Sequence, residues 1–265
     1  MTLRLAWFAT AKGSSSKLLF ERTSAAITAG ALAAEIAVVF CNRERGQSAN
    51  TDAFLEAVAG RGTPLVTISS GAWRKRVGGG ISKPGEPLAA WRADYEEAVR
   101  VSLAPYDPQA AVLAGFMLIT PELSEWLPLL NLHPALPNGP VGTWQEVVRE
   151  LIEAGADESG MMLQRSSREL DRGPVLSSCR YPLRGGEFDE HWADASESGP
   201  AEALFDAIRA RGVKREPHFL VASLQAVADG RISIPELSDK GPNVDLTADV
   251  EAALEPEMSA GEGSG

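Results

Sequence analysis

The sequence predicts an α/β fold with a mostly parallel central sheet. Short apolar runs alternate with amphipathic stretches along most of the chain, which is typical of repeated βα units. With 265 residues, 44% of them hydrophobic and 23% charged, the chain has the composition of an ordinary globular protein. This length suits one large domain or two small ones. No apolar run approaches the roughly 20 residues that a membrane-spanning helix needs.

The individual elements follow from the same alternation. Five apolar runs are predicted as strands, at 3–9, 34–40, 64–68, 111–114 and 129–132. Amphipathic stretches between them are predicted as helices at 15–29, 51–59 and 91–103. A helix is expected over 143–154, because Thr143 followed three residues later by Glu146 forms a capping box. Further on we expect a strand pair, 160–164 with 174–182, and two final helices, 200–211 and 217–229.

Two segments depart from this rhythm. The stretch 69–87 combines Trp73-Arg74-Lys75-Arg76 with three successive glycines and two prolines, and is predicted to be an inserted mobile loop. It could serve as a lid or phosphate gate, or simply be a solvated insertion. The segment 239–265 has seven acidic residues and one basic residue and ends in Gly and Ser, so we expect a disordered acidic tail. The catalytic body is predicted to span 1–238.

Bulk charge and composition exclude several functions. A net charge of −11 argues against nonspecific binding of nucleic acid. Cys41 and Cys179 lie far apart, which indicates reduced thiols in a cytoplasmic protein. The three histidines and two cysteines have no metal-ligand spacing, so we expect no bound metal. The apolar stretch near Met1 is too short for a signal peptide, and no membrane partner is expected. The sequence leaves the oligomeric state open.

The chemistry is concentrated in two motifs. Asn131-Leu132-His133-Pro134 follows an apolar run and is expected at the C-terminal end of a strand, and Glu169-Leu170-Asp171-Arg172-Gly173-Pro174 is expected in a tight turn. Asn131 could donate to a developing oxyanion, His133 could exchange a proton, and Asp171 could orient the imidazole or a water. Transfer of an acyl group between two amines needs these functions and no covalent nucleophile. The alternative is that these side chains form a polar pair at a strand end.

The first βα turn is the candidate anion site. In Thr10-Ala11-Lys12-Gly13-Ser14-Ser15-Ser16, the glycine permits close approach of an anion, and the following N–H groups belong to a helix N-terminus. The spacing matches neither a P-loop nor a dinucleotide-binding fingerprint. The alternative is a serine-rich helix cap.

These motifs, together with Val112-Leu113-Ala114-Gly115-Phe116-Met117, resemble the folate-dependent formyltransferases, the glycinamide ribonucleotide transformylases in particular. The resemblance spans about residues 3 to 235. It implies a Rossmann-like formyltransferase fold and an enzyme that passes a formyl group from 10-formyltetrahydrofolate, as co-substrate, to a phosphorylated amine. It also implies a place in one-carbon metabolism and purine biosynthesis. By the same resemblance Asn131 stabilises the oxyanion with His133, and Asp171 orients His133 or a proton-relaying water.

The resemblance also implies substrate contacts. A phosphate would be bound by Gly13, Ser14, Ser15 and Arg92; the rest of the acceptor by Met117 and Glu216; and folate by Leu118, Leu132, Gln164 and Leu170. For three of these residues a plainer role stays open. Arg92 could be a solvated helix-start residue, Met117 could be core packing, and Glu216, which precedes Pro217, could be a helix-start acid.

The sequence departs from the family pattern around the substrates. The segment 134–143 has lost one leucine and gained Gly and Pro relative to the family. Ser15 stands where the family usually has Asn, Leu118 where many members have Arg, and Gln164 where the family has His. These changes leave open a different amine acceptor. Hydrolysis of 10-formyltetrahydrofolate is a further alternative, although hydrolases of the superfamily carry an additional N-terminal domain and Leu3 already begins the predicted sheet. A folate-binding protein without turnover is the third, and the presence of Asn131, His133 and Asp171 together argues against it.

Overall fold

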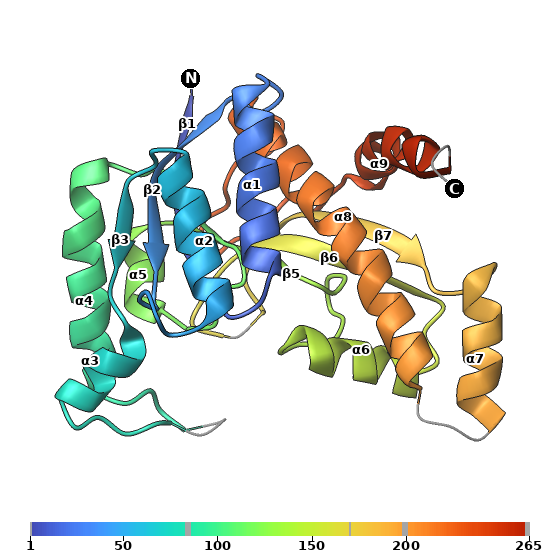
Figure 1. The fold of residues 1–265 in the computed structure, drawn as a ribbon, viewed down its shortest axis with the longest axis horizontal. Helices are drawn as coiled ribbons and strands as arrows, with labels where there is room; N and C mark the ends of the chain where they lie inside the picture. The colour runs from blue at the N-terminus through green and yellow to red at the C-terminus, as the bar shows by residue number, and fades with distance from the viewer. Residues whose placement is uncertain (1, 83–85, 170, 198–200, 263–265) are drawn as a thin grey trace. The chain divides into compact units, whose positions relative to one another are not determined.

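The computed structural model describes residues 2–82, 86–169, 171–197 and 201–262. It divides into two compact units. The first contains residues 1–131 together with 166–168, and the second contains 132–165 together with 169–265. Both are α/β structures, so the predicted fold class is confirmed (Figure 1). Within the described residues, no helix combines the length and the apolar character needed to cross a membrane.

The first unit is built on parallel strands in the order β3-β2-β1-β4-β5. Its strands are β1 (Leu3–Ala9), β2 (Ala34–Cys41), β3 (Leu65–Thr67), β4 (Ala110–Leu113) and β5 (Leu129–His133), the last of which runs on into the second unit. Its helices are α1 (Ser15–Thr28), α2 (Ala49–Gly60), α3 (Ser70–Arg76), α4 (Trp91–Leu103), the short 3-10 helix η1 (Ala104–Tyr106) and α5 (Pro121–Trp126).

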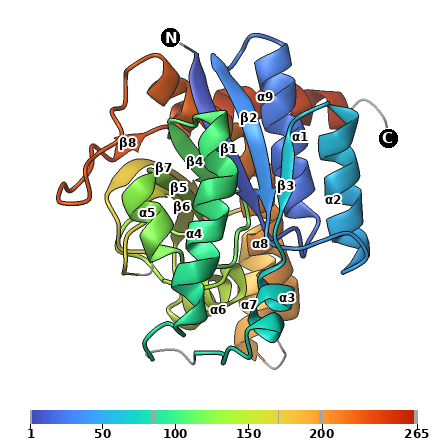
Figure 2. The same cartoon turned by 90° about the vertical axis from the view of Figure 1, so that its left-hand side faces the viewer.

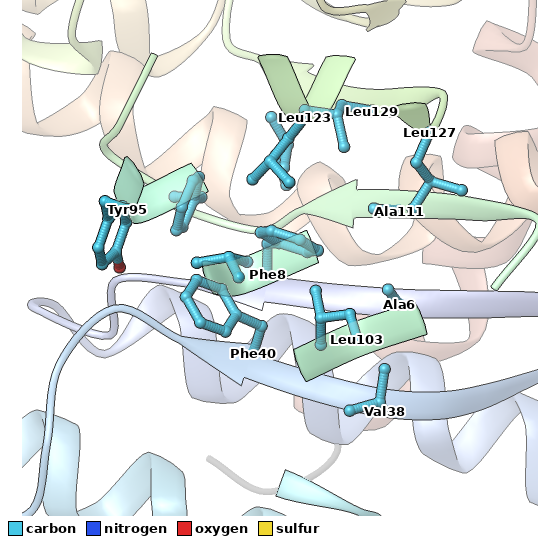
Figure 3. Close-up of a cluster of buried hydrophobic side chains, with 13 residues drawn as sticks. Ala6, Phe8, Val38, Phe40, Tyr95, Leu103, Ala111, Leu123, Leu127 and Leu129 are labelled. Atoms are coloured by element: carbon cyan, nitrogen blue, oxygen red, sulfur yellow. The ribbon is translucent and has the colours of Figure 1, made fainter. Parts of the chain in front are cut away.

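Helices cover both faces of this sheet, with α1 and α2 on one side and α4 and α5 on the other (Figure 2). Successive side chains of β1 point to opposite faces of the sheet, and helices cover both faces. Every residue from Leu5 to Ala9 is therefore apolar and buried. Trp7 packs edge-on against Phe20 of α1. Phe8 faces the opposite way, into a cluster with Phe40 and with Tyr95 of α4 (Figure 3). The carboxyl ends of these parallel strands position the loops discussed below.

The second unit continues the strand order as β5-β6-β7-β8. Strands β6 and β7 form the predicted pair and run antiparallel, and β8 runs parallel to β7. The elements are α6 (Trp144–Glu153), β6 (Glu158–Arg165), β7 (Val175–Pro182), α7 (Glu187–Glu197), α8 (Glu202–Ala228), β8 (Val244–Asp245) and α9 (Thr247–Glu262).

The two predicted final helices are a single one, α8, and the expectation of a break was wrong. Pro217 lies inside this 27-residue helix, although proline removes one helical hydrogen bond at a cost of about 3 kcal/mol. Buried residues continue on both sides of the proline, Ile208 before it and Phe219 and Leu220 after it. Burial of such side chains stabilises by about 1.5–3 kcal/mol each, which outweighs the lost hydrogen bond.

The expectation of a disordered tail after residue 239 was also wrong. The structure places β8 and α9 there, as parts of the second unit. Leu246, Val250 and Leu254 are buried at helical spacing. Glu251 makes a two-point ion pair with Arg215 of α8, at 2.7 and 3.0 Å. An apolar stripe hidden within an acidic composition is therefore sufficient to dock the segment.

The predicted inserted loop at 69–87 begins with an unexpected helix. Ser69 caps α3 by accepting a hydrogen bond from the Ala72 N–H at 3.2 Å, and Trp73 packs against Tyr95 of α4. Apolar residues further along are exposed, among them Ile81 at 74%. Residues 83–85 lie outside the described part of the chain.

Candidate active site

His133 lies at the carboxyl end of β5, and its side chain is only 3% exposed. Its Nε2 atom is 2.9 Å from the carbonyl oxygen of Pro140. Since a carbonyl oxygen can only accept a hydrogen bond, Nε2 carries a proton and donates it. The backbone of the loop after β5 thus fixes the orientation of the imidazole.

Asp171 follows β6 in a turn and adopts a left-handed backbone conformation, with φ of +51°. Aspartate tolerates this region better than most residues, and such conformations cluster at functional sites. Its side chain is 5% exposed. The carboxylate accepts a hydrogen bond from the Gly142 N–H at Oδ2 (3.1 Å) and one from the Gln164 side-chain amide at Oδ1 (3.2 Å).

The remaining imidazole nitrogen of His133, Nδ1, is 3.5 Å from Oδ2 of Asp171. Because Nε2 already holds one proton, a neutral imidazole turns an unprotonated nitrogen toward a carboxylate oxygen. A second proton, on Nδ1, converts this contact into an attractive ion pair. The pair is therefore arranged to take up one proton, which is the property required of a general base for an attacking amine.

The loop 134–143 holds this pair through main-chain atoms, and sequence reasoning missed both of the contacts that it makes. Pro140 contributes its carbonyl and Gly142 its N–H, so neither contact has a side-chain signature in the sequence. Gly142 has φ of +108°, and a Cβ atom added there would meet Oε2 of Glu146 at 2.6 Å. Glu146 completes the predicted capping box with Thr143, which is confirmed. Gly142 thus links the N-terminus of α6 to Asp171, because its N–H donates to the Asp171 carboxylate and its Cα lies against Glu146.

Asn131, the other expected catalytic residue, is the last residue of the first unit and is half-buried. It pairs with Leu113 of β4 in the parallel register. Asn131 and His133 are alternate residues of β5, so their side chains leave the strand on the same face.

The turn expected to bind phosphate is exposed at Gly13 and Ser14 and half-buried at Ser15. It leads into the 14-residue helix α1, and Ser14 at the N-cap makes no side-chain capping bond. Ser16 donates to the Ala114 carbonyl at 3.0 Å, which ties the turn to the end of β4. The N–H groups of the first helical turn lie at the positive end of the helix dipole, which favours anions.

Arg92, expected as a phosphate ligand, lies in the first turn of α4, and its guanidinium donates to the Ile119 carbonyl. Burial lowers the pKa of Arg92, while the nearby Glu96 carboxylate acts in the opposite direction. The same two residues line a groove of about 450 Å³ in the first unit. In this structure Arg92 stabilises the segment after β4.

The acceptor-binding candidates differ from expectation in one case. Met117 is 59% exposed, which excludes core packing, and its N–H donates to the Thr10 hydroxyl at 2.8 Å. Glu216 does not precede a helix start, because it lies within α8; it is buried and pairs with Arg209 at 2.6 Å.

The folate-binding candidates lie in different surroundings. Leu118 and Leu132 are half-buried, and Leu118 packs against the core of the first unit. Gln164 is 1% exposed and contacts Asp171, so it is a neighbour of the candidate catalytic pair. Leu170 lies outside the described residues. Among the described side chains, no group of three or more His, Cys, Asp or Glu is arranged to hold a metal ion.

Comparison with known proteins places this geometry in context. The model of the formyl transferase family matches residues 3–195. The phosphoribosylglycinamide formyltransferase of Escherichia coli K12 is 28% identical over 149 residues, covering 55% of this chain and 61% of that protein. A methionyl-tRNA formyltransferase of Aromatoleum aromaticum is 25% identical over 173 residues, covering 62% of this chain and 48% of that protein. These matches thus span between about half and three fifths of the two relatives.

Among solved structures, the phosphoribosylglycinamide formyltransferase of Coxiella burnetii in complex with CHES superimposes with a TM-score of 0.64. The alignment covers 92% of this chain and 99% of that one at 21% identity. At this identity the likeness establishes a shared fold.

Proposed function

Because the chain belongs to the formyl transferase family, we propose that it transfers a formyl group from 10-formyltetrahydrofolate to the amine of glycinamide ribonucleotide. The observation that carries this proposal is the contact between His133 and Asp171 at the end of the strand that bears Asn131. The likeness to the Escherichia coli enzyme supports the choice of acceptor. A cytoplasmic location accompanies this proposal.

The proposed reaction needs one proton acceptor and one oxyanion donor. The amine attacks the formyl carbon, a carbon–nitrogen bond forms, and negative charge develops on the formyl oxygen. In the proposal the amide of Asn131 donates a hydrogen bond to that oxygen, and the imidazole of His133 does so only when Nε2 releases the Pro140 carbonyl. The His133–Asp171 pair takes the amine proton directly or through a water, and the departing folate nitrogen takes up a proton as its bond to the formyl carbon breaks.

The proposed acceptor site uses the exposed turn at Gly13, Ser14 and Ser15 for the phosphate. The Arg92 guanidinium donates one of its hydrogen bonds to the Ile119 carbonyl, so in the proposal the phosphate shares this side chain with the segment after β4. Glu216 likewise binds an acceptor only if Arg209 releases it. The support for a phosphorylated amine therefore rests mainly on the turn.

The reduced folate is proposed to contact Leu118, Leu132 and Leu170. Gln164, which sequence reasoning placed in the same group, is enclosed next to Asp171 and is better suited to act on that residue than on the pterin.

A second candidate function keeps the donor and changes the amine. It is supported by the likeness to a methionyl-tRNA formyltransferase and by the altered loop 134–143. Hydrolysis of the donor uses the same pair with water in place of the amine.

The first test is a formyl-transfer assay with a 10-formyl folate donor, monitored by the absorbance of the deformylated folate. Turnover that requires glycinamide ribonucleotide is expected. Equal turnover without an amine would identify a hydrolase instead. Donor binding without turnover would redirect the search to other amines, starting with methionyl-tRNA.

The phosphate assignment has its own test in Gly13→Ala. No atom lies within 4 Å of a Cβ built at Gly13, and its φ is not positive, so the methyl group disturbs the ligand and not the fold. We expect the KM for glycinamide ribonucleotide to rise on the order of tenfold, as for loss of one charge-assisted hydrogen bond. Gly60→Ala, at an equally open glycine, is the matched control. An unchanged KM in Gly13→Ala would remove the turn from the acceptor site.

A further inference from the structure

The carboxylate of Asp171 is held by a side chain that takes no direct part in the proposed chemistry. Gln164, near the end of β6, is 1% exposed, and its Nε2 is 3.2 Å from Oδ1 of Asp171. The opposite carboxylate oxygen receives the Gly142 N–H and faces His133. The two oxygens thus have separate partners: Gln164 donates to Oδ1, while Oδ2 faces the imidazole.

The chemistry of the amide makes this orientation one-sided. If the amide were reversed, Oε1 would face the carboxylate and two acceptors would repel each other. The orientation with Nε2 toward Asp171 leaves Oε1 buried with no donor in the described part of the chain. Leaving a buried acceptor unsatisfied is unfavourable, so the contact with Asp171 must outweigh that cost.

The neighbouring charges do not compete for this role. Arg165, the next residue of β6, is turned to the opposite face, where it binds the Pro235 carbonyl and Glu236. Among the contacts described for this network, the ionisable side chains are His133 and Asp171. An amide does not titrate, so Gln164 can donate this hydrogen bond whatever the pH.

We propose that Gln164 is a positioning residue, which holds the carboxylate of Asp171 in the rotamer that presents Oδ2 to Nδ1 of His133. This inference rests on the proposed function, since it assigns Gln164 an effect on the same proton transfer. Without the amide, Oδ1 loses this hydrogen bond, and the carboxylate is held less firmly against rotation about its Cβ–Cγ bond, although Gly142 still donates to Oδ2.

The test uses three substitutions in the full chain. Gln164→Leu keeps the approximate volume and removes the donor, and we expect kcat to fall on the order of 10- to 100-fold with little change in either KM. Gln164→Glu adds a second carboxylate beside Asp171, so the acidic limb of the kcat profile should move to higher pH. Gln164→His restores a donor and should recover most of the lost kcat. Met162→Leu, at a buried residue on the same face of β6, is the packing control.

A second readout separates this inference from the proposed function. The chain has three histidines, so the pH titration of the His133 imidazole can be followed by NMR without any substrate. Its midpoint should move in Gln164→Leu and Gln164→Glu and stay in place in Met162→Leu. A shift of this midpoint supports the positioning role even if glycinamide ribonucleotide is not the acceptor. An unchanged midpoint in both variants, together with a kcat for Gln164→Leu within twofold of the wild type, would overturn it.

Discussion

Asp171→Asn separates the charge of the candidate proton acceptor from its shape. The substitution replaces one carboxylate oxygen by an NH₂ group and leaves the volume nearly unchanged. The Asn oxygen can keep the hydrogen bond from Gly142, while its NH₂ group faces Gln164. Gln164 can then reverse its amide and accept through Oε1, the atom that otherwise has no donor among the described residues. The contact between residue 171 and Gln164 can therefore form again without a charge.

The expected stability change is small for this reason. Two charge-assisted hydrogen bonds become neutral ones, a loss of about 1 kcal/mol each. For a chain of this size, that corresponds to a fall in Tm of a few degrees. Activity responds differently, because His133 loses the anion that stabilises its protonated form. We expect kcat to fall by about 10²- to 10⁴-fold, the range for removal of a general acid–base function.

The assay measures kcat and the KM for folate in the formyl-transfer reaction, together with thermal unfolding. Asp189→Asn is the matched control, since Asp189 also accepts a backbone N–H, from Gly185 at 2.8 Å, but is exposed. A variant at residue 171 with kcat within threefold of the wild type would refute the assignment. So would a loss confined to the KM for folate.

Three further predictions concern stability and reactivity. Burial raises the pKa of both Cys41 and Cys179 to about 11, so neither thiol should be alkylated by iodoacetamide at about pH 8 until urea unfolds the chain; rapid labelling of the folded protein would contradict this. Burial also raises the pKa of Glu96, so the unfolded state loses this proton at lower pH than the folded state, and stability should fall as pH rises between the two pKa values. Glu96→Gln should flatten the urea-unfolding free energy as pH rises above the ordinary glutamate pKa, and an unaltered pH dependence would count against it. Glu251→Ala leaves Arg215 buried without its carboxylate and should lower the free energy of unfolding by about 2 kcal/mol. This is below the 3–5 kcal/mol of a fully buried pair, because the Glu251 side chain is 43% exposed. The control Asp249→Asn, at an exposed acid of the same helix, should cost on the order of 0.5 kcal/mol, and equal losses in the two variants would show that the ion pair is unimportant.

Local patterns were sufficient to predict much of this fold. The first strand and the helix Trp91–Leu103 have the expected bounds, and the capping box at Thr143 is present. Each of these depends on residues a few positions apart, where periodicity and capping chemistry decide the structure.

Features that depend on distant partners could not be read in this way. The continuity of α8 through Pro217 follows from packing on both sides of the proline, and the docking of α9 depends on a pairing between Glu251 and Arg215. For the candidate site, His133 and Asp171 were predicted from their chemistry as a pair. Their holding groups were not, because the Pro140 carbonyl and the Gly142 N–H are backbone atoms that every sequence possesses.

The backbone character of these contacts has a consequence for how the chain can vary. A carbonyl or N–H group is supplied equally by almost any residue, so most side chains of the loop 134–143 can be exchanged while the imidazole and carboxylate stay in register. Gly142 is an exception, because its conformation and the nearby Glu146 exclude a side chain. Thr143 is another, because its hydroxyl caps α6. Much of the loop can thus differ in sequence without displacing His133 or Asp171.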